Sequence, residues 1–400
     1  MSAEHVKYSV KPSIYILALV VFLATLPGLY FGISHHPISP VPGAILFGIA
    51  IFGAAFVLSW AAEAAQIDIS ESLAVAILAL IAVLPEYAVD FVFTWKAAHN
   101  PAQAHYAIAN MTGANRLLVG MGWPVVLLLY ILFKKKKAVV LHESQRVEIF
   151  YLAMATLYSF IIPIKGNLTL IDTVILVSLF GLYTRRAAQM ETVEPDLVGP
   201  VKIVANMSTG LRRTVTVLLF LYAGAVIFLV AEPFAESLVA TGAILGVNEF
   251  ILVQWLAPIA SEAPEFIIAA TWAIRGAAGS ALKALISSKV NQWTLLVGTI
   301  PLVFAISGGA IRPFVFDTLQ THELLLTAAQ SIFAVAVLVN LRLERLDGLL
   351  LFVLFAIQLV FEQTRIEITI IYIALAVVFH IAHRKSLIPA AIIGLGLKKK

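Results

Sequence analysis

The feature that most constrains this chain is a series of long apolar segments that recurs from one end to the other. Segments such as 14–33 and 215–230 contain no charged residue. They approach the ~20 residues that an α-helix needs to cross ~30 Å of hydrocarbon, whereas a strand of a membrane barrel needs only ~10 alternating residues. Because lipid offers no hydrogen bonds to an open backbone, such segments must be helical. We therefore predict an all-α polytopic membrane protein.

The composition excludes other classes of protein. Of the 400 residues, 61% are hydrophobic and only 12% are charged, which is too little charge to cover the surface of a soluble enzyme of this size. The net charge of +4 is typical of basic residues retained on the cytoplasmic side, so nucleic acid is not an expected partner. The absence of cysteine excludes disulfides, thiolate metal sites and thiol catalysis.

Charge clusters and Pro/Gly positions divide the apolar segments into about 12 transmembrane helices. The predicted spans are 14–33, 43–66, 70–97, 106–133, 147–164, 167–183, 214–240, 248–272, 280–306, 322–340, 346–362 and 366–383. Basic residues, among them Lys134–Lys137 and Arg185–Arg186, then fall on one side if the N-terminus is inside. The positive-inside rule therefore predicts a protein of the cytoplasmic membrane with both termini in the cytoplasm.

The two halves of the chain share a pattern at a nearly constant offset. The matched pairs are Ile69-Ser70-Glu71 with Val247-Asn248-Glu249, Pro85-Glu86 with Pro264-Glu265, and Leu117–Gly120 with Leu295–Gly298, 178 or 179 positions apart. The Pro-Glu pair lies in the third span and again in the eighth, so the two copies would face opposite ways. We predict an inverted-topology repeat, the architecture of transporters that hold substrate near the membrane midplane.

This repeat predicts two five-span copies with an extra span at each end. The predicted parts are an N-terminal extra span in 1–42, a first repeat in 43–183, a cytoplasmic linker in 184–213, a second, inverted repeat in 214–362, and a C-terminal extra span with a basic tail in 363–400.

Carboxylates gather at the Pro-Glu pairs, although each ionisable group at membrane depth costs about 2.5–3.5 kcal/mol. Glu86 and Asp90 are four residues apart, and Glu262 and Glu265 are three apart, so each pair shares a helical face. The neighbouring prolines free backbone carbonyls. Hard cations such as Ca²⁺ and Na⁺ prefer oxygen ligands of this kind. The alternative is that Pro-Glu only kinks a helix.

The span after each pair adds neutral oxygen atoms and a base. The polar residues of these spans are Asn110, Thr112 and Asn115 in the first copy and Ser287, Ser288 and Asn291 in the second. Amides and hydroxyls can bind a cation or bridge helices. Arg116 and Lys289 lie about ten residues into their spans, where we expect them to pair with the carboxylates. They could form structural salt bridges, or Lys289 could exchange a proton for a metal ion.

These motifs make the chain similar to the calcium/cation antiporter superfamily, which contains sodium/calcium and proton/calcium exchangers. The segments Val83–Glu86 and Ser261–Glu265 resemble its Thr-Ser-x-Pro-Glu helix, and Ala109–Asn115 resembles its Gly-Asn-x-x-Gly-Ser-Asn helix, with the resemblance covering about 43–362. The resemblance implies Glu86 and Glu265 as principal cation ligands, assisted by Asn110, Asn115, Ser261 and Asn291. Ala82, Val83 and Glu262 depart from the pattern by removing hydroxyls and adding an acid, which favours proton coupling.

The sequence therefore predicts a secondary antiporter, not an enzyme, that exchanges Ca²⁺ or a similar hard cation for Na⁺ or H⁺ by alternating access. One alternative is a monovalent Na⁺/H⁺ antiporter, and another is a non-transporting scaffold or sensor locked by Arg116 and Lys289. We expect inorganic cations and the lipid bilayer as partners, and no cofactor. The candidate metal ligands are Glu86, Asp90, Glu262, Glu265, Asn110, Asn115, Ser261 and Asn291, with Arg116 and Lys289 as charge-compensating or proton-exchanging groups.

Overall fold

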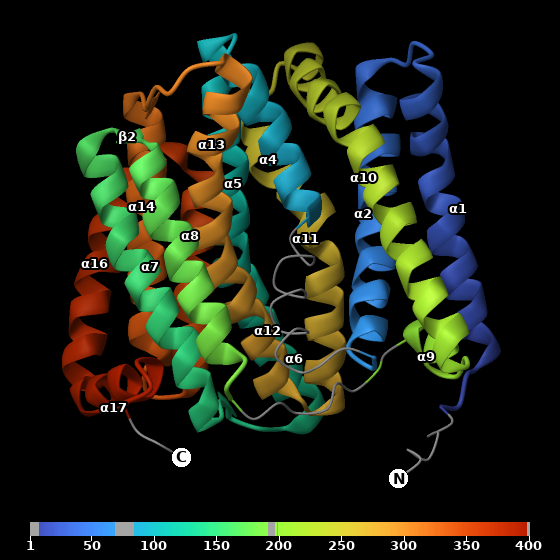
Figure 1. The fold of residues 1–400 in the computed structure, drawn as a ribbon. Helices are drawn as coiled ribbons and strands as arrows, with labels where there is room; N and C mark the ends of the chain where they lie inside the picture. The colour runs from blue at the N-terminus through green and yellow to red at the C-terminus, as the bar shows by residue number, and fades with distance from the viewer. Residues whose placement is uncertain (1–7, 69–83, 191–196, 198, 398–400) are drawn as a thin grey trace. The chain divides into compact units, whose positions relative to one another are not determined.

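The computed structural model describes residues 8–68, 84–190, 197 and 199–397, which are mostly helical (Figure 1). Its longer helices are α1 (Pro12–Ser34), α2 (Pro40–Ala65), α4 (Leu84–Ala97), α5 (Ala104–Leu117), α6 (Trp123–Lys134), α7 (Arg146–Lys165), α8 (Leu170–Ala187), α10 (Thr209–Leu245), α11 (Glu249–Arg275), α12 (Ala278–Asn291), α13 (Val297–Gly308), α14 (Thr318–Leu338), α15 (Arg345–Val360), α16 (Arg365–Ala382) and α17 (Arg384–Gly394). Short elements are α9 (Val201–Ala205), the 3₁₀ turns η1 (Pro101–Gln103), η3 (Glu143–Gln145) and η5 (Glu362–Thr364), the π-helical turns η2 (Leu118–Gly122) and η4 (Gln292–Leu296), and strands β1 (Ala138–Val140), β2 (Asn167–Leu168), β3 (Phe314–Val315) and β4 (Arg342–Glu344).

Within these residues, eight helical segments are long and apolar enough to cross a membrane, and a ninth is gained if the bent α11 counts as one span. They coincide with predicted spans, so the prediction of an apolar helical protein is confirmed. The predicted spans 167–183 and 346–362 correspond to α8 and α15, which are not among the eight. Parts of the third span, with Ile69-Ser70-Glu71, Ala82 and Val83, lie outside the described residues.

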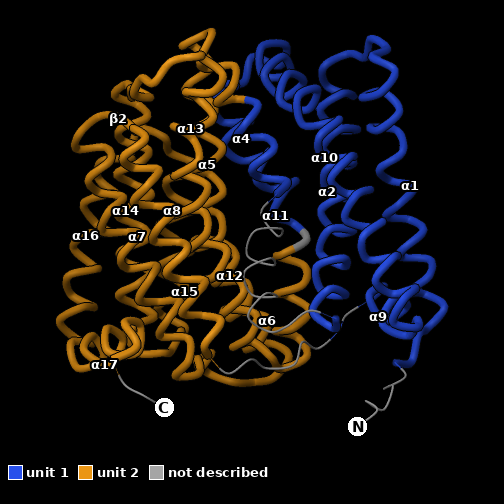
Figure 2. Tube along the Cα trace, in the orientation of Figure 1, with its two compact units in different colours: residues 1–92, 191–264 blue, residues 93–190, 265–400 orange. Residues whose placement is uncertain are grey.

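The chain divides into two compact units, residues 1–92 with 191–264 and residues 93–190 with 265–400 (Figure 2). In the first unit, α2 packs against both α1 and α10. Small residues allow the close approach, since a Cβ on Gly28 would lie 2.5 Å from the Ala50 Cβ. The hydroxyls of Thr25 and Tyr222 also bond α1 to α10. The three long helices therefore form one tightly packed group.

An ion pair joins the end of α2 to the beginning of α10. Arg212 Nε and Nη2 donate to the two carboxylate oxygens of Asp68 at 2.6 and 2.8 Å. These hydrogen bonds, with a further contribution from Arg213, lower the pKa of Asp68 although partial burial opposes the shift. The pair ties the turn after α2 to the first turn of α10.

The second unit is built around α14. Of an 18-residue stretch of α14, 78% is buried, compared with 17% for the segment that contains α16. Helix α14 packs against α5, α7 and α16, while α13 packs against α8. Figure 1 shows α7, α8, α13 and α14 side by side. Many large apolar side chains on other helices are exposed, as expected for a protein surface that lies in lipid.

Two broken helices of this unit have the same plan. Helix α5 has 14 residues, the π-helical turn η2 has five, and α6 has 12. Helix α12, turn η4 and helix α13 repeat these lengths, each element beginning 174 positions later. A π-turn widens a helix locally and is frequent at functional sites. The sequence analysis aligned Leu117–Gly120 at 178, one helical turn away from this structural offset.

The strand pairs and helix caps follow a similar offset. Strand β1, after α6, pairs with β4, before α15, and β3, after α13, pairs with β2, before α8. The capping boxes that begin α8 and α15, Thr169 with Asp172 and Glu344 with Asp347, are 175 positions apart. Those of His142 with Gln145 and Asp317 with Gln320 are also 175 apart. The mostly helical fold thus also contains two short antiparallel pairs, which neighbouring loops form because their unpaired backbone groups need partners.

Helices also occupy parts of the segment 184–213, for which we predict a linker. Helix α8 continues to Ala187 and α10 already begins at Thr209, with the short α9 between them. The final apolar segment forms α17, whose 11 residues are too few to span a bilayer.

Candidate cation site

The described residues place the predicted acids of the first unit on two helices. Glu86 and Asp90 lie on α4 and are 1% and 0% exposed, and Glu262 lies on α11 and is 3% exposed. Such burial of carboxylates requires compensation by cations or hydrogen bonds. The Ser261 hydroxyl, also buried, donates within its own helix to the carbonyls of Ala257 and Pro258.

The other predicted acid, Glu265, belongs to the second unit and is partly exposed. It directly follows Pro264, at which α11 divides into the pieces Glu249–Ala263 and Glu265–Arg275. Proline removes an intrahelical hydrogen bond, which accounts for the division of the helix at this residue.

The predicted amide ligands lie on the two broken helices and are fully buried. Asn110 and Asn115 belong to α5 and Asn291 to the last turn of α12. The Asn115 side-chain amide donates from Nδ2 to the Met111 carbonyl at 3.0 Å. Its Oδ1 atom is buried and has no hydrogen-bond donor among the described residues. A buried carbonyl oxygen in this state is suited to coordinate a cation.

Arg116 forms an ion pair with a carboxylate that the sequence analysis did not consider. Its Nη2 contacts Glu323 on α14, and its Nη1 donates to Gln358 on α15 at 3.2 Å. Glu323 is 0% exposed and also binds Arg365 at the start of α16. One buried carboxylate therefore links α5, α14 and α16, and it compensates Arg116.

Lys289 is fully buried and contacts the backbone of the other broken helix. Its Nζ donates to the carbonyl of Asn115 at 2.8 Å and lies 5.6 Å from the centre of the Trp293 ring. The sequence predicted a carboxylate as partner of Lys289, and the hydrogen bond that the structure describes goes to a neutral carbonyl oxygen. The ammonium therefore bridges α12 and α5.

A second ion pair, in which only the acid is buried, resembles that of Glu323. Glu148 lies 175 positions before Glu323 and faces Lys283 of α12, with Nζ and Oε1 3.7 Å apart. Glu148 of α7 thus meets α12, and Glu323 of α14 meets Arg116 of α5. Neither Glu148 nor Glu323 was predicted, because the sequence matches lie at an offset of 178 or 179 and these two residues lie 175 apart. The equal spacing of the helix-capping residues is the signal that would have found them.

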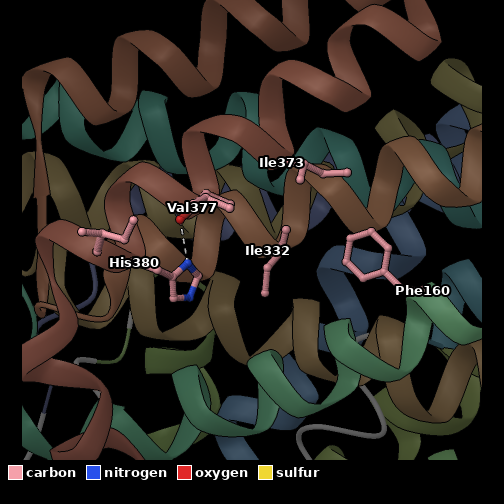
Figure 3. Close-up of a pocket in the computed structure, with 7 residues that line it drawn as sticks. Phe160, Ile332, Ile373, Val377 and His380 are labelled. Atoms are coloured by element: carbon pink, nitrogen blue, oxygen red, sulfur yellow. Dashed lines mark hydrogen bonds between the residues drawn. The ribbon is translucent and has the colours of Figure 1, made fainter.

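Preorganised metal centres and pockets are few among the described residues. In the part of the chain that the structure describes, no group of three or more His, Asp or Glu side chains could hold a metal ion. A shallow apolar pocket of about 380 Å³ lies beside α16, where Phe160, Ile332, Ile373, Val377 and His380 line it (Figure 3). The His380 ring bonds through Nδ1 to the Ala376 carbonyl. This wall offers no oxygen cluster for a cation.

Comparison with known proteins identifies the class. The model of the sodium/calcium exchanger protein family matches residues 39–187 and 215–362. The chain belongs to this family, and the predicted membership is confirmed. No match was found among curated protein sequences.

Solved structures agree with this assignment. The chain is 41% identical to a crystal structure of the H⁺/Ca²⁺ exchanger CAX, over 97% of this chain and 100% of that one, with a TM-score of 0.93. It is 15% identical to native YfkE over 85% and 98% of the two chains, with a TM-score of 0.61. It is 17% identical to the sodium-calcium exchanger NCX_Mj over 86% and 99%, with a TM-score of 0.52. The last two similarities show the fold alone.

Proposed function

We propose that this protein is a secondary antiporter that exchanges Ca²⁺ for a monovalent cation, with H⁺ as the favoured counter-ion. The observation that carries the proposal is the 41% identity, over nearly the whole of both chains, to an H⁺/Ca²⁺ exchanger. Buried carboxylates and amides are the oxygen ligands that Ca²⁺ prefers. Carboxylates can also take up protons when the metal ion leaves, which provides a chemical basis for exchange.

The proposed mechanism is alternating access by two inverted copies of five spans, with extra spans at each end and twelve in all. The match of the family model to two segments of almost equal length supports a repeat. Further support comes from the broken helices, which recur 174 positions apart, and from the capping boxes, which recur 175 positions apart. Transporters of this architecture bind substrate at discontinuous helices between the copies. The basic loops favour both termini on the cytoplasmic side.

The proposed ligands are the carboxylates of the two Pro-Glu helices and the amides of the broken helices. Glu86 and Glu265 would provide most of the negative charge, with Asp90 and Glu262 beside them in the sequence. The buried Oδ1 of Asn115 supports a direct role for this amide. Asn110, Asn291 and Ser261 would complete the oxygen set. Each charged ligand reduces the cost of removing a divalent ion from water.

Flux measurements on the purified protein in liposomes test this function. We expect Ca²⁺ uptake driven by a pH gradient, and Glu86→Gln or Glu265→Gln should reduce it at least 100-fold. The amide keeps the side-chain volume but removes the charge needed to bind the ion. Thermal unfolding of each variant checks that the fold persists. Sodium flux without Ca²⁺ transport would instead indicate a monovalent antiporter, and near wild-type Ca²⁺ flux in either variant would exclude that carboxylate as a ligand.

A further inference from the structure

The break in α5 exposes backbone carbonyls that side chains of other helices bind. The π-helical turn η2 begins at Leu118, and a π-turn disrupts the regular pairing of carbonyls with the amide four residues later. Immediately before it, the Asn115 carbonyl accepts from Lys289 Nζ at 2.8 Å. The next carbonyl, of Arg116, accepts from Gln330 Nε2 at 3.4 Å. Side chains from α12 and α14 thus bind the two carbonyls that precede the break in α5.

Lys289 occupies in α12 the position that Asn115 occupies in α5. Each is the twelfth residue of a 14-residue helix and stands three residues before a π-turn. The equivalent residues of the two broken helices therefore touch each other. One is a neutral amide whose Oδ1 remains available, and the other is an ammonium.

The surroundings of the ammonium are those of a cation site. Lys289 is 0% exposed, its Nζ binds a backbone carbonyl, and the Trp293 ring lies within cation–π range. The Trp293 indole is itself held in place, since its Nε1 donates to the Ser331 hydroxyl at 2.8 Å. Carbonyl oxygens at breaks in transmembrane helices are the atoms that bind Na⁺ and K⁺ in transporters and channels.

We propose that the Lys289 ammonium acts as a tethered monovalent cation at the break of α5. It occupies the place of a bound Na⁺ or K⁺, and it positions Asn115 so that Oδ1 faces a transported ion. The exchanger then requires no free monovalent cation at this position. The consequence for transport rests on the proposed function, but the occupation of the position does not.

Thermal unfolding of Lys289→Met tests the occupation without any transport. The methionine side chain has a similar length but no charge. The carbonyl oxygen of Asn115 is then free of the ammonium and can coordinate a small cation. In choline chloride we expect Lys289→Met to unfold about 5 °C below wild type, and about 100 mM NaCl or KCl should recover at least half of the loss by binding the folded state. The same exchange of salts should change the Tm by less than about 1 °C in three other proteins. These are wild type, Lys289→Arg and the exposed-surface control Lys136→Met.

Calcium flux in the same preparations tests the consequence. For Lys289→Met we expect the half-saturating Ca²⁺ concentration to rise about tenfold in choline and to return toward the wild-type value in Na⁺ or K⁺. A Lys289→Met protein that responds to Na⁺ and K⁺ no more than wild type overturns the proposal. If it unfolds in every salt, Lys289→Gln replaces it, and a lack of response there overturns the proposal equally. Absence of Ca²⁺ flux in wild type would instead refute the proposed function.

Discussion

Replacing Glu323 by glutamine should destabilise the protein more than the same change at Glu148, which lies 175 positions earlier. Glu323 is fully buried and compensates two guanidinium groups, of which Arg116 is only 1% exposed. Glutamine keeps the size of the side chain but removes the carboxylate charge that Arg116 contacts. At Glu148 the partner Lys283 is 35% exposed and can stay hydrated when the acid is lost.

The expected magnitudes follow from these exposures. Removing one partner of a buried pair costs about 3–5 kcal/mol, and we take about 3 kcal/mol because glutamine retains one acceptor oxygen. The partly exposed pair should contribute about 1 kcal/mol or less. With an unfolding entropy of ~2.1 cal/mol/K per residue over 400 residues, 3 kcal/mol corresponds to a Tm lower by about 4 °C. Glu148→Gln should lower the Tm by about 1 °C.

The assay is thermal unfolding in one detergent, with the double variant Arg116→Gln/Glu323→Gln as the decisive third protein. Removing both charges should recover most of the loss, since replacing a whole buried pair costs far less than breaking it. Arg365 retains the Glu362 carboxylate, 3.3 Å away, in both variants. Equal losses for Glu323→Gln and Glu148→Gln, or a double variant less stable than Glu323→Gln alone, would refute the reasoning.

Two further predictions concern the first unit and the break of α5. The lowered pKa of Asp68 means that the unfolded chain takes up the proton first, so the stability contributed by the Arg212 pair is present above about pH 5 and is lost as the pH falls through the lowered pKa. Asp68→Asn should therefore lower the Tm at pH 7 and flatten its dependence on pH below 5, and unchanged acid unfolding would contradict this. Gly120→Ala should destabilise by about 1–3 kcal/mol, because the new Cβ would lie 2.2 Å from the Phe355 Cγ. The control Gly181→Ala, with nothing within 4 Å of its Cβ, should leave the Tm unchanged or raise it.

The class of the protein could be predicted from the sequence because membranes constrain composition so strongly. Uncharged segments of spanning length permit helices only, and the described helices coincide with the predicted spans. The Pro-Glu pairs and the polar segment Ala109–Asn115 were sufficient to indicate the exchanger family, which the match of the family model confirms. The assignment of individual ligands and the count of twelve spans remain predictions.

The sequence matches lie 178 or 179 positions apart, whereas the π-turns and the capping boxes of the structure recur at 174 and 175 positions. Short matches of apolar residues can be shifted by one helical turn without losing their pattern, and the sequence analysis aligned Leu117–Gly120 at 178. The helix caps require particular side chains at particular places, so Thr169, Asp172, Glu344 and Asp347 fix the spacing at 175. The short strands β1 to β4 escaped prediction because two or three residues carry no detectable pattern.

The sequence by itself determined which residues are costly to bury, and the tertiary structure decided which of them meet. Depth and helical face follow from local spacing, so the burial of Arg116 and Lys289 was predictable. Their contacts join residues 207 and 174 positions apart, Arg116 with Glu323 and Lys289 with the Asn115 carbonyl. Such pairs depend on how separate helices pack and on carbonyls that a π-turn makes available. Neither property is encoded in the periodicity of a single segment, because the partner lies on another helix.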